Sequence, residues 1–586
     1  MEVTYNQGVE TNSALIPDGI VAGSLAQAPA LIERLLPVQK LSAEAYKEQM
    51  AVQGKTLTAL GSYWKGRKPL ILNRACLLGC LLPANDNPVR DLAILEMLLG
   101  MDDESLAARQ KGPVRPKEIL QWVSLNRIED YFDVLPAGAL PVGGQVSPLL
   151  LEMPELRVSW RADVSRQERR RLEAQTLLEQ SATYRERVSA ALRPEEVPAD
   201  DLHFHIWREV NEHLGTQAQS IPELVEQLGI MRFGHRPRVA DTFSGSGQIP
   251  FEAARLGCDV YASDLNPVAC MLTWGAFNIV GGQPAFRAKI RMAQAEVVAA
   301  VQKEIDELKI ETDGNGWTPK TMLYCLEMVD PQTGWNVPLL STRLVSKGQS
   351  MLAELVPNNA TKRFDIIIRK AKTAKELQEA EVGTIWSDGR GQDLYVRYVV
   401  DERSYKEKIS ALRGDYRTKT GNNGNRLRLW EKSDFQPKVD DLYQERLYAI
   451  QWSRPKKENN PTGKKKEYEF RSITSEDLAR EATVSRYMTN NLAEWQANGW
   501  VPDMLIEQGG ETDRLMRERG WTYWHHLFSP RQLLYLGLAS KYIRARADNT
   551  VAPLLLFLAR TTDWSSKLCR YGTGAARESV AQTFYN

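Results

Sequence analysis

The chain has 586 residues, of which 43% are hydrophobic, 75 are basic and 74 are acidic, so its formal net charge is only +1. This composition excludes a disordered chain and indicates roughly three or four globular domains, while the balanced charge confines any nucleic-acid surface to a local patch. The six cysteines include no C-x-x-C pair, which excludes a disulfide-rich secreted framework.

The apolar segments argue against export and against membrane insertion. The opening residues, MEVTYNQGVETN, lack the basic and apolar regions of a signal peptide. The longest apolar runs, near 76–84 and 551–559, are far shorter than the ~20 residues that span a bilayer. We therefore expect a cytoplasmic protein that does not associate with membranes.

The first 200 residues are predicted to form two helical parts. Residues 31–107 are rich in leucine, and Pro69 suits the first turn of the helix that follows it. We divide the stretch into a helical N-terminal domain, 1–110, and a charged helical connector, 111–200. Four arginines of the connector favour a solvated helix face, with a phosphate-contacting patch as the alternative: Arg166, Arg169, Arg170 and Arg171.

Residues 201–305 are predicted to hold a cofactor-binding core. The stretch VADTFSGSGQIPFEAARLGCDVYASDLNPVA, 239–269, indicates a strand ending at Asp241, a glycine loop, a helix over 249–256 and a second strand ending near Asp264. The resulting β-α-β unit places a ligand beyond the carboxyl ends of its strands, beside the free N–H groups of the helix.

The side chains of this unit suit S-adenosylmethionine. Gly245 and Gly247 let the backbone approach a bound molecule, since a Cβ at either position would intrude. Asp264, 17 positions after Gly247, is placed to accept hydrogen bonds from two ribose hydroxyls, and Asp241 is placed to meet a cationic amine. An adenosine that carries an amino acid uses both carboxylates, whereas Asp241 would repel the pyrophosphate of a dinucleotide.

Two other interpretations of the glycine loop remain. A nicotinamide or flavin site requires the pattern G-x-G-x-x-G, but Pro250 stands where the third glycine would be. The second is a glycine-rich turn without a ligand, against which the correctly spaced acid argues. Three histidines that precede the unit are spaced by two and eight residues, and we do not expect a metal site from His203, His205 and His213.

The remainder of the chain changes character at about residue 470. Residues 306–470 are predicted to form a strand-rich insertion, with strand runs at 364–368 and 394–400. Its basic segment, 454–466, is typical of a flexible loop, with a phosphate-gripping loop as the alternative.

Residues 471–586 are predicted to be helical again. Ser529-Pro530-Arg531-Gln532 has the chemistry of a capped helix start, because serine caps, proline fits the first turn and glutamine completes a capping box. His525 and His526, beside Trp521 and Trp524, are expected to be packing and surface residues and not catalytic ones.

Several blocks of this chain resemble known enzymes. Phe243-Ser244-Gly245-Ser246-Gly247 resembles the F-x-G-x-G motif of amino-group DNA methyltransferases. Further blocks are similar to the adenine-specific DNA methylases that contain a zinc ribbon, large proteins of which several are associated with phage defence. These blocks are YWKGRKPL (63–70), NRA (73–75), RFG (232–234), IPFEAARLGC (249–258), ASDLNPVA (262–269), WTYW (521–524) and FSPRQLL (528–534).

The resemblance implies an α/β fold: a Rossmann-like class I methyltransferase core with helical N-terminal and C-terminal additions and a strand-rich insertion that carries target recognition. It implies double-stranded DNA as partner, with the target base flipped out and its amino nitrogen attacking the methyl group in line. It also implies a role in a restriction or phage-defence system. The cofactor would be S-adenosyl-L-methionine, bound by Asp241, Phe243, Gly245, Gly247, Asp264 and Asn266. The resemblance alone also implies that Trp64, Arg67 and Lys68 face the cofactor or a nucleic acid; the alternative is that Tyr63 and Trp64 only form a hydrophobic staple for the helix that follows.

Two parts of the family pattern do not occur in these residues. The methyl-transfer motif, Asp or Asn followed by Pro-Pro and an aromatic residue, is absent from the sequence. The region that corresponds to the zinc ribbon, 324–399, contains a single cysteine, Cys325, and one cysteine cannot bind zinc alone. The zinc-knuckle turns are expected to survive as ordinary turns at 330–334 and 386–391.

We therefore expect no catalytic residue and no metal site in this chain. In the favoured hypothesis the catalytic loop comes from a second polypeptide or from a part of the enzyme outside these residues. The alternative is a non-catalytic cofactor-binding or nucleic-acid-binding subunit of a defence complex.

Overall fold

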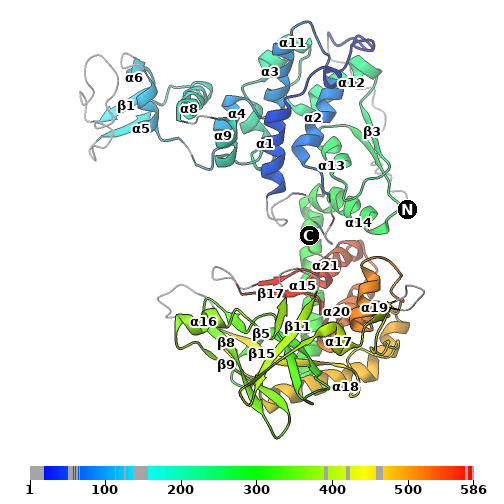
Figure 1. Cartoon of the computed structure of the whole chain (residues 1–586). Coiled ribbons are helices and arrows are strands. Elements are labelled where there is room, and N and C mark those ends of the chain that lie inside the picture. The colour runs from blue at the N-terminus through cyan, green and yellow to red at the C-terminus, as the bar shows by residue number, and fades with distance from the viewer. Residues whose placement is uncertain are drawn as a thin grey trace. The chain divides into compact units, whose positions relative to one another are not determined.

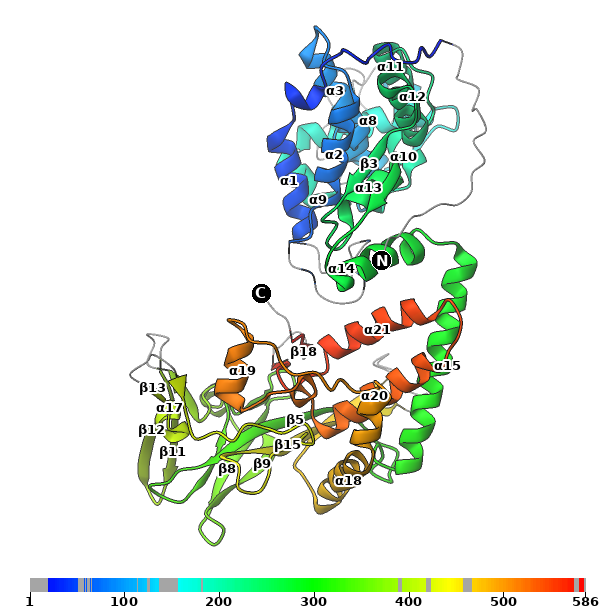
Figure 2. The ribbon, with the colours of Figure 1, turned by 90° about the vertical axis from the view of Figure 1, so that its right-hand side faces the viewer.

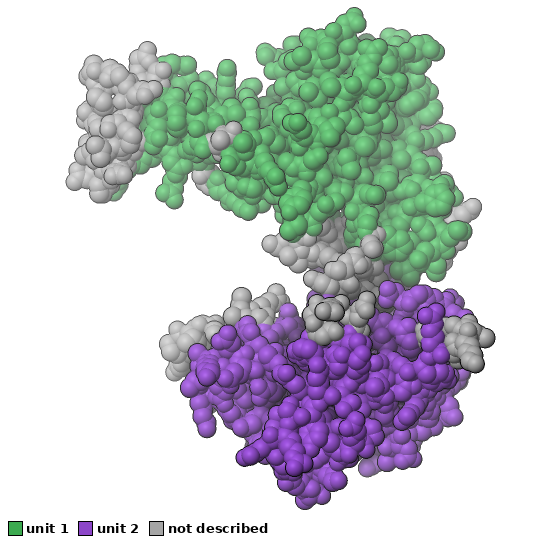
Figure 3. All heavy atoms as spheres, viewed as in Figure 1, with its two compact units in different colours: residues 1–60, 64–283 green, residues 61–63, 284–586 purple. Residues whose placement is uncertain are grey.

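The computed structural model describes residues 19–50, 57, 60, 64, 66–112, 114–123, 127–135, 156–180, 183–387, 393–417, 423–456, 466–573 and 579–583. The chain forms two compact units, which Figure 3 colours separately: unit 1 of residues 1–60 and 64–283, and unit 2 of residues 61–63 and 284–586. The boundary between the units lies inside the stretch 201–305. The division of the chain into five parts stays a prediction.

Unit 1 is mainly helical (Figure 1). Its α-helices are α1 (Val38–Gln49), α2 (Leu70–Leu81), α3 (Pro88–Leu99), α4 (Asp103–Ala108), α5 (Pro116–Ile119), α6 (Ile128–Tyr131), α8 (Arg166–Gln180), α9 (Tyr184–Ala190), α10 (Ala199–His203), α11 (Trp207–Leu214), α12 (Ile221–Phe233), α13 (Gln248–Arg255) and α14 (Pro267–Gly275). Short helical turns are η1 (Leu31–Glu33), η3 (Leu120–Trp122), η5 (Pro194–Glu196) and η6 (Ala276–Val280). The strands are β1 (Phe132–Leu135), β2 (Arg157–Trp160), β3 (Arg238–Asp241) and β4 (Asp259–Ala262).

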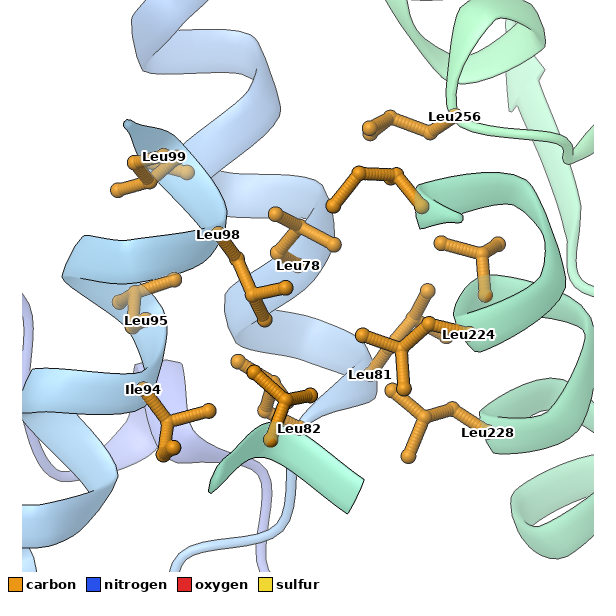
Figure 4. Close-up of a cluster of buried hydrophobic side chains, with 14 of the residues drawn as sticks. Leu78, Leu81, Leu82, Ile94, Leu95, Leu98, Leu99, Leu224, Leu228 and Leu256 are labelled. Atoms are coloured by element: carbon orange, nitrogen blue, oxygen red, sulfur yellow. The ribbon is translucent and has the colours of Figure 1, made fainter. Parts of the chain in front are cut away.

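The main hydrophobic core of unit 1 surrounds α2. This helix begins directly after Pro69, as predicted, and it is apolar on most of its surface, so it is buried on several sides. Figure 4 shows its leucines meeting those of α3 and α12. Arg232, at the end of α12, donates hydrogen bonds to the carbonyl oxygens of Leu81 and Leu82 at 2.7 and 3.1 Å. The block RFG therefore includes a residue that ties α12 to the C-terminal end of α2.

A smaller core of unit 1 joins α5, α6 and α8 to the antiparallel pair β1–β2. Two of the four arginines of the predicted charged face make contacts inside this region. Arg169 donates to the carbonyl oxygens of Arg161 and Val164 at 2.8 and 3.2 Å, and Arg170 pairs with Glu173 at 2.9 Å. Much of this arginine cluster therefore stabilises the unit itself.

The predicted β-α-β unit is confirmed in unit 1. β3, α13 and β4 follow one another in the expected order, and the two strands run parallel from the pair Arg238–Asp259 to the pair Asp241–Ala262. Among the described residues these strands pair only with each other. Exposure alternates along both strands, so one face packs on the main core while the other, with Tyr261, is exposed. The Rossmann-like core as a whole stays a prediction.

Unit 2 combines a large sheet with several long helices (Figures 1 and 2). Its helices are α15 (Pro284–Leu308), α16 (Ala374–Glu379), α17 (Ile409–Arg413), α18 (Ser475–Ala497), α19 (Thr512–Arg519), η7 (Trp524–Leu527), α20 (Pro530–Arg544) and α21 (Val551–Asp563). Its strands are β5 (Thr318–Val329), β6 (Asn336–Leu339), β7 (Leu344–Ser346), β8 (Met351–Asn358), β9 (Arg363–Lys370), β10 (Ile385–Ser387), β11 (Leu394–Val400), β12 (Arg403–Lys408), β13 (Tyr416–Arg417), β14 (Asn423–Gly424), β15 (Tyr443–Pro455), β16 (Lys466–Arg471), β17 (Arg570–Gly572) and β18 (Ser579–Ala581).

The main sheet of unit 2 is mixed and has the strand order β16-β15-β5-β6-β9-β8-β7. All neighbouring pairs are antiparallel except β6 and β9. The two predicted strand runs coincide with β9 and β11, so the stretch 306–470 is strand-rich, as expected. At the centre of the sheet the fully buried Glu327 accepts hydrogen bonds from Arg363 and Arg446 at 2.6 and 2.5 Å. This ion cluster, centred on buried Glu327, joins β5, β9 and β15.

The turn and cap predictions for unit 2 are confirmed where the structure describes them. Ser529 and Gln532 form a reciprocal capping box at the start of α20. In the first predicted zinc-knuckle turn, the N–H of Gly334 donates to the carbonyl of Asp330 at 2.7 Å. The second predicted turn lies partly outside the described residues, as does most of the basic segment 454–466.

The expectation that His525 and His526 lie partly at the surface is wrong, because both side chains are completely buried. His526 Nδ1 accepts the backbone N–H of Thr522 at 3.1 Å, and its Nε2 donates to the carbonyl of Glu431 at 3.0 Å. Burial lowers the pKa of His526 to about 3. Both ring nitrogens are thus used in packing, as a neutral residue.

Over the ranges that the structure describes, none of the helices is both long enough and apolar enough to cross a membrane.

Candidate functional site

The candidate site lies at the carboxyl ends of β3 and β4. Because the strands are parallel and adjacent, their carboxyl ends meet at one edge, so the glycine loop after β3 and the loop after β4 lie together. The N–H of Ser263 donates to the carbonyl of Asp241 at 3.0 Å, and the N–H of Ser244 donates to the carbonyl of Ser263 at 3.1 Å. The structure therefore brings the six candidate residues into two loops that are bonded to each other.

Asp264 is the residue that joins these loops through its side chain. Its Oδ2 accepts the N–H of Gly245 at 2.9 Å, and its Oδ1 accepts the N–H of Asn266 at 2.8 Å. An ionised carboxylate has about four acceptor positions, so two remain for hydroxyl groups of a ligand. Asp264 as a whole is half-buried.

Asp241 and Asn266 shape the backbone around Asp264. Asp241 Oδ1 accepts the N–H of Phe243 at 3.2 Å, and its Oδ2 accepts no hydrogen bond from the residues that the structure describes. Asn266 Oδ1 accepts the N–H of Val268 at 2.9 Å and so caps the N-terminus of α14. Asp241 therefore keeps an acceptor for a ligand, whereas Asn266 acts on the helix.

The two glycines of the loop have different neighbours. Both have positive φ angles, +52° at Gly245 and +77° at Gly247, which favour glycine. A Cβ on Gly247 would lie 2.8 Å from Oγ1 and 2.9 Å from Cα of Thr273 on α14. A Cβ on Gly245 would lie 2.9 Å from Nε1 of Trp64. The sequence interpretation assigns both glycines to ligand approach, but each one also makes room for a protein neighbour.

We expect Gly247→Ala to destabilise unit 1 by about 2–4 kcal/mol, because alanine adds left-handed backbone strain to an overpacked contact with the Thr273 backbone. Thermal unfolding measures this loss. Gly234→Ala is the matched control, since Gly234 has the same φ of +77° but nothing within 4 Å of its added Cβ. Equal losses for the two variants would contradict the steric part of this argument.

The rim of the site is apolar and exposed. Phe243, in the glycine loop, is 83% exposed, and Leu265, which directly follows Asp264, is 97% exposed. The two side chains belong to the two loops that form the site, so a ligand bound there could cover apolar surface. Sequence reasoning missed Leu265, although an apolar residue between two turn-forming polar residues was a usable signal.

An ion cluster around the buried Glu252 connects α13 to α2, and it was not predicted from the sequence. Glu252 on α13 has a fully buried side chain, which accepts from Arg74 Nε on α2 and from Arg255 Nη1, each at 2.7 Å. The pair of Arg74 and Glu252 is separated by 178 positions in the sequence, so no local pattern announces it. It joins α2 to the helix that begins at the glycine loop.

A second buried carboxylate holds the start of α2. Glu48 accepts the N–H groups of Leu70 and Ile71 at 2.8 and 3.3 Å, which are free donors at the helix N-terminus. Burial raises the pKa of Glu48 to about 7, although the two helix N–H groups act in the opposite direction.

The three histidines that were considered as metal ligands, His203, His205 and His213, are half-buried or buried within unit 1. His205 Nε2 lies 2.9 Å from Asp102 Oδ2, and His213 Nε2 lies 2.7 Å from Asp91 Oδ1. His203 is buried, and burial lowers its pKa to about 4. Within the described residues, no group of three or more His, Cys, Asp or Glu side chains is arranged to hold a metal ion.

Comparison with known proteins places only the N-terminal region. Residues 35–98 match the family model described as a protein of unknown function, DUF1156. The match covers α1, α2 and nearly all of α3, and it includes Trp64 and Arg74. No curated protein and no solved structure matches the chain.

Proposed function

We propose that this chain binds S-adenosyl-L-methionine at the loops after β3 and β4. The observation that carries the proposal is Asp264, which lies at the end of the second parallel strand and is hydrogen-bonded to the N–H of Gly245. In this assignment the two free acceptor positions of Asp264 bind the ribose hydroxyls. Oδ2 of Asp241, which accepts no hydrogen bond from the described part of the chain, binds the amino group of the methionine part.

The exposed apolar rim supports a ligand with a flat ring. Phe243 and Leu265 lie next to the two acids along the chain and are almost fully exposed. An adenine ring would cover part of this apolar surface, which provides a favourable free energy of burial. No phosphate group is needed in this arrangement, and Asp241 disfavours one.

For the whole enzyme we propose an S-adenosylmethionine-dependent amino-group DNA methyltransferase, with adenine as the favoured base, in a restriction or phage-defence system. The blocks FSGSG and ASDLNPVA support this assignment by their resemblance to such enzymes. A Rossmann-like class I core would require further strands beside β3 and β4. Within the described ranges β3 and β4 pair with no further strand and one face of the pair is exposed, which favours such strands, since parallel sheets are usually covered on both faces.

The methyl-transfer motif must then come from outside these 586 residues, because no Pro-Pro-aromatic sequence occurs in them. The same absence favours a second candidate function, a non-catalytic subunit of a defence complex that binds the cofactor or a nucleic acid. In either case double-stranded DNA is the proposed polymer.

Calorimetric titration of the purified chain with S-adenosylmethionine tests the cofactor assignment. We expect saturable one-to-one binding, and no comparable binding of NAD, because Asp241 repels a pyrophosphate. A folded chain that binds neither compound, or that binds NAD better, would overturn the assignment. Transfer of a radioactive methyl group to duplex DNA, with and without a polypeptide that carries the Asp-Pro-Pro-aromatic motif, then separates the enzyme from the non-catalytic subunit.

A further inference from the structure

The indole ring of Trp64 lies directly against the glycine loop. Built on Gly245, a Cβ would lie 2.9, 3.3 and 3.5 Å from Nε1, Cε2 and Cζ2 of Trp64. Gly245 is also the residue whose N–H donates to Asp264. Trp64 is half-buried. Gly245 therefore lies between the indole ring and Asp264, the carboxylate that is assigned to the ribose.

The segment that carries Trp64 is anchored to the same elements. Leu70, six residues later, is buried in a cluster with Phe251 of α13 and Ala276. On α2, Arg74 forms the buried ion pair with Glu252 of α13. The matched region 35–98 therefore packs on the glycine loop and on the helix that follows it, and does not form a separate domain within unit 1.

We propose that Trp64 is an aromatic wall of the cofactor site, which covers bound S-adenosylmethionine and makes tight binding depend on the DUF1156-matched segment. The inference rests on the proposed function and adds a specificity-determining residue to it. The glycine loop and the exposed Phe243 and Leu265 leave a ligand open to water on at least one side. An indole at Gly245 excludes water there and offers a stacking surface to the adenosine.

The test is the affinity of Trp64→Ala and Trp64→Phe for S-adenosylmethionine, measured by calorimetry. We expect Trp64→Ala to weaken binding about tenfold or more, the loss that follows from removing one stacked aromatic ring. Trp64→Phe keeps a ring and should lose less affinity. Trp122→Ala is the matched control, because Trp122 is an exposed tryptophan of η3, next to the smaller core of unit 1. Thermal unfolding of each variant verifies that unit 1 stays folded.

Backbone hydrogen exchange provides a second test, which requires no substitution of Trp64. Addition of S-adenosylmethionine to the unaltered chain should slow exchange of the backbone amides from Trp64 to Ile71, as it slows those of the glycine loop. Protection of the glycine loop alone would overturn the proposal.

The outcomes separate this proposal from the cofactor assignment. If the unaltered chain binds and Asp264→Ala does not, but Trp64→Ala binds as tightly as the unaltered chain, the cofactor site stands and the wall is overturned. Tighter binding by Trp64→Ala also overturns the wall, because the indole would then obstruct the ligand. If the unaltered chain does not bind, the cofactor assignment itself fails.

Discussion

Asp264→Ala is expected to weaken binding of S-adenosylmethionine by at least about a hundredfold. The substitution removes both acceptors that we propose for the ribose hydroxyls, and hydrogen bonds to a charged group contribute about 1.5–3 kcal/mol each. It also removes the bonds that the carboxylate accepts from Gly245 and Asn266, so the two loops lose their connection. Calorimetric titration of the purified variant measures the loss.

Two further variants make this experiment specific. Asp259→Ala removes an exposed carboxylate from the opposite end of β4, and we expect it to bind like the unaltered chain. Asp264→Asn keeps one oxygen acceptor without the charge and should bind with intermediate affinity. If Asp259→Ala and Asp264→Ala lose affinity equally, a general change in charge would explain both, and Asp264 would have no special role.

Glu252→Ala is expected to destabilise unit 1 by about 3–5 kcal/mol. Removing one partner of a buried ion pair leaves the other charge buried without compensation. The resulting loss of folding free energy is larger than the stabilisation that the intact pair provides. Glu252 is fully buried, and Arg74 is nearly so, with its Nε 2.7 Å from the carboxylate. The unfolding transition of unit 1 in urea, followed by circular dichroism, measures the effect.

An exposed pair of the same unit is the control for this prediction. Glu226 pairs with Arg236 at 2.9 Å, but both side chains are substantially exposed, so Glu226→Ala should cost less than about 1 kcal/mol. The double variant Arg74→Leu, Glu252→Leu should recover much of the loss, because it removes the buried charge of Arg74 and leaves only Arg255, which is 30% exposed, without its partner. A loss for Glu252→Ala that is no larger than for Glu226→Ala would contradict the assigned role of the pair.

These two experiments probe different properties of one region. Asp264 acts at the surface of the site, and its removal should change affinity more than stability. Glu252 acts beneath the site, and its removal should change stability first and affinity through the position of α13. The Arg74–Glu252 pair also suggests why the matched region and the β-α-β unit belong to one compact unit.

The predictions that the structure confirms rest on local signals. The strand ends at Asp241 and Ala262, the helix that starts after Pro69 and the capping box at Ser529 are each specified by residues within a few positions of one another. Such signals act through backbone conformation and neighbouring hydrogen bonds, so they can be recognised in a single sequence. The positions of the candidate residues at one sheet edge follow from the parallel pairing of the two strands.

The predictions that failed or were missing concern burial and distant contacts. His525 and His526 are polar residues in an aromatic stretch, and only the surrounding elements decide that they are buried. The contact of Trp64 with Gly245 spans 181 positions, and that of Arg74 with Glu252 spans 178. Neither contact leaves a periodic or compositional trace.

The sequence by itself determined the β-α-β unit, the two acids after its strands and the absence of a methyl-transfer motif, because these are properties of short stretches. The tertiary structure alone decided which distant residues support and border the site: Arg74 beneath it, Thr273 against Gly247, and Trp64 against Gly245. The physical reason is that burial and close packing depend on which surfaces come into contact when the chain folds. Segments with the same local sequence pattern can pack against different partners, so the pattern alone does not specify the contact.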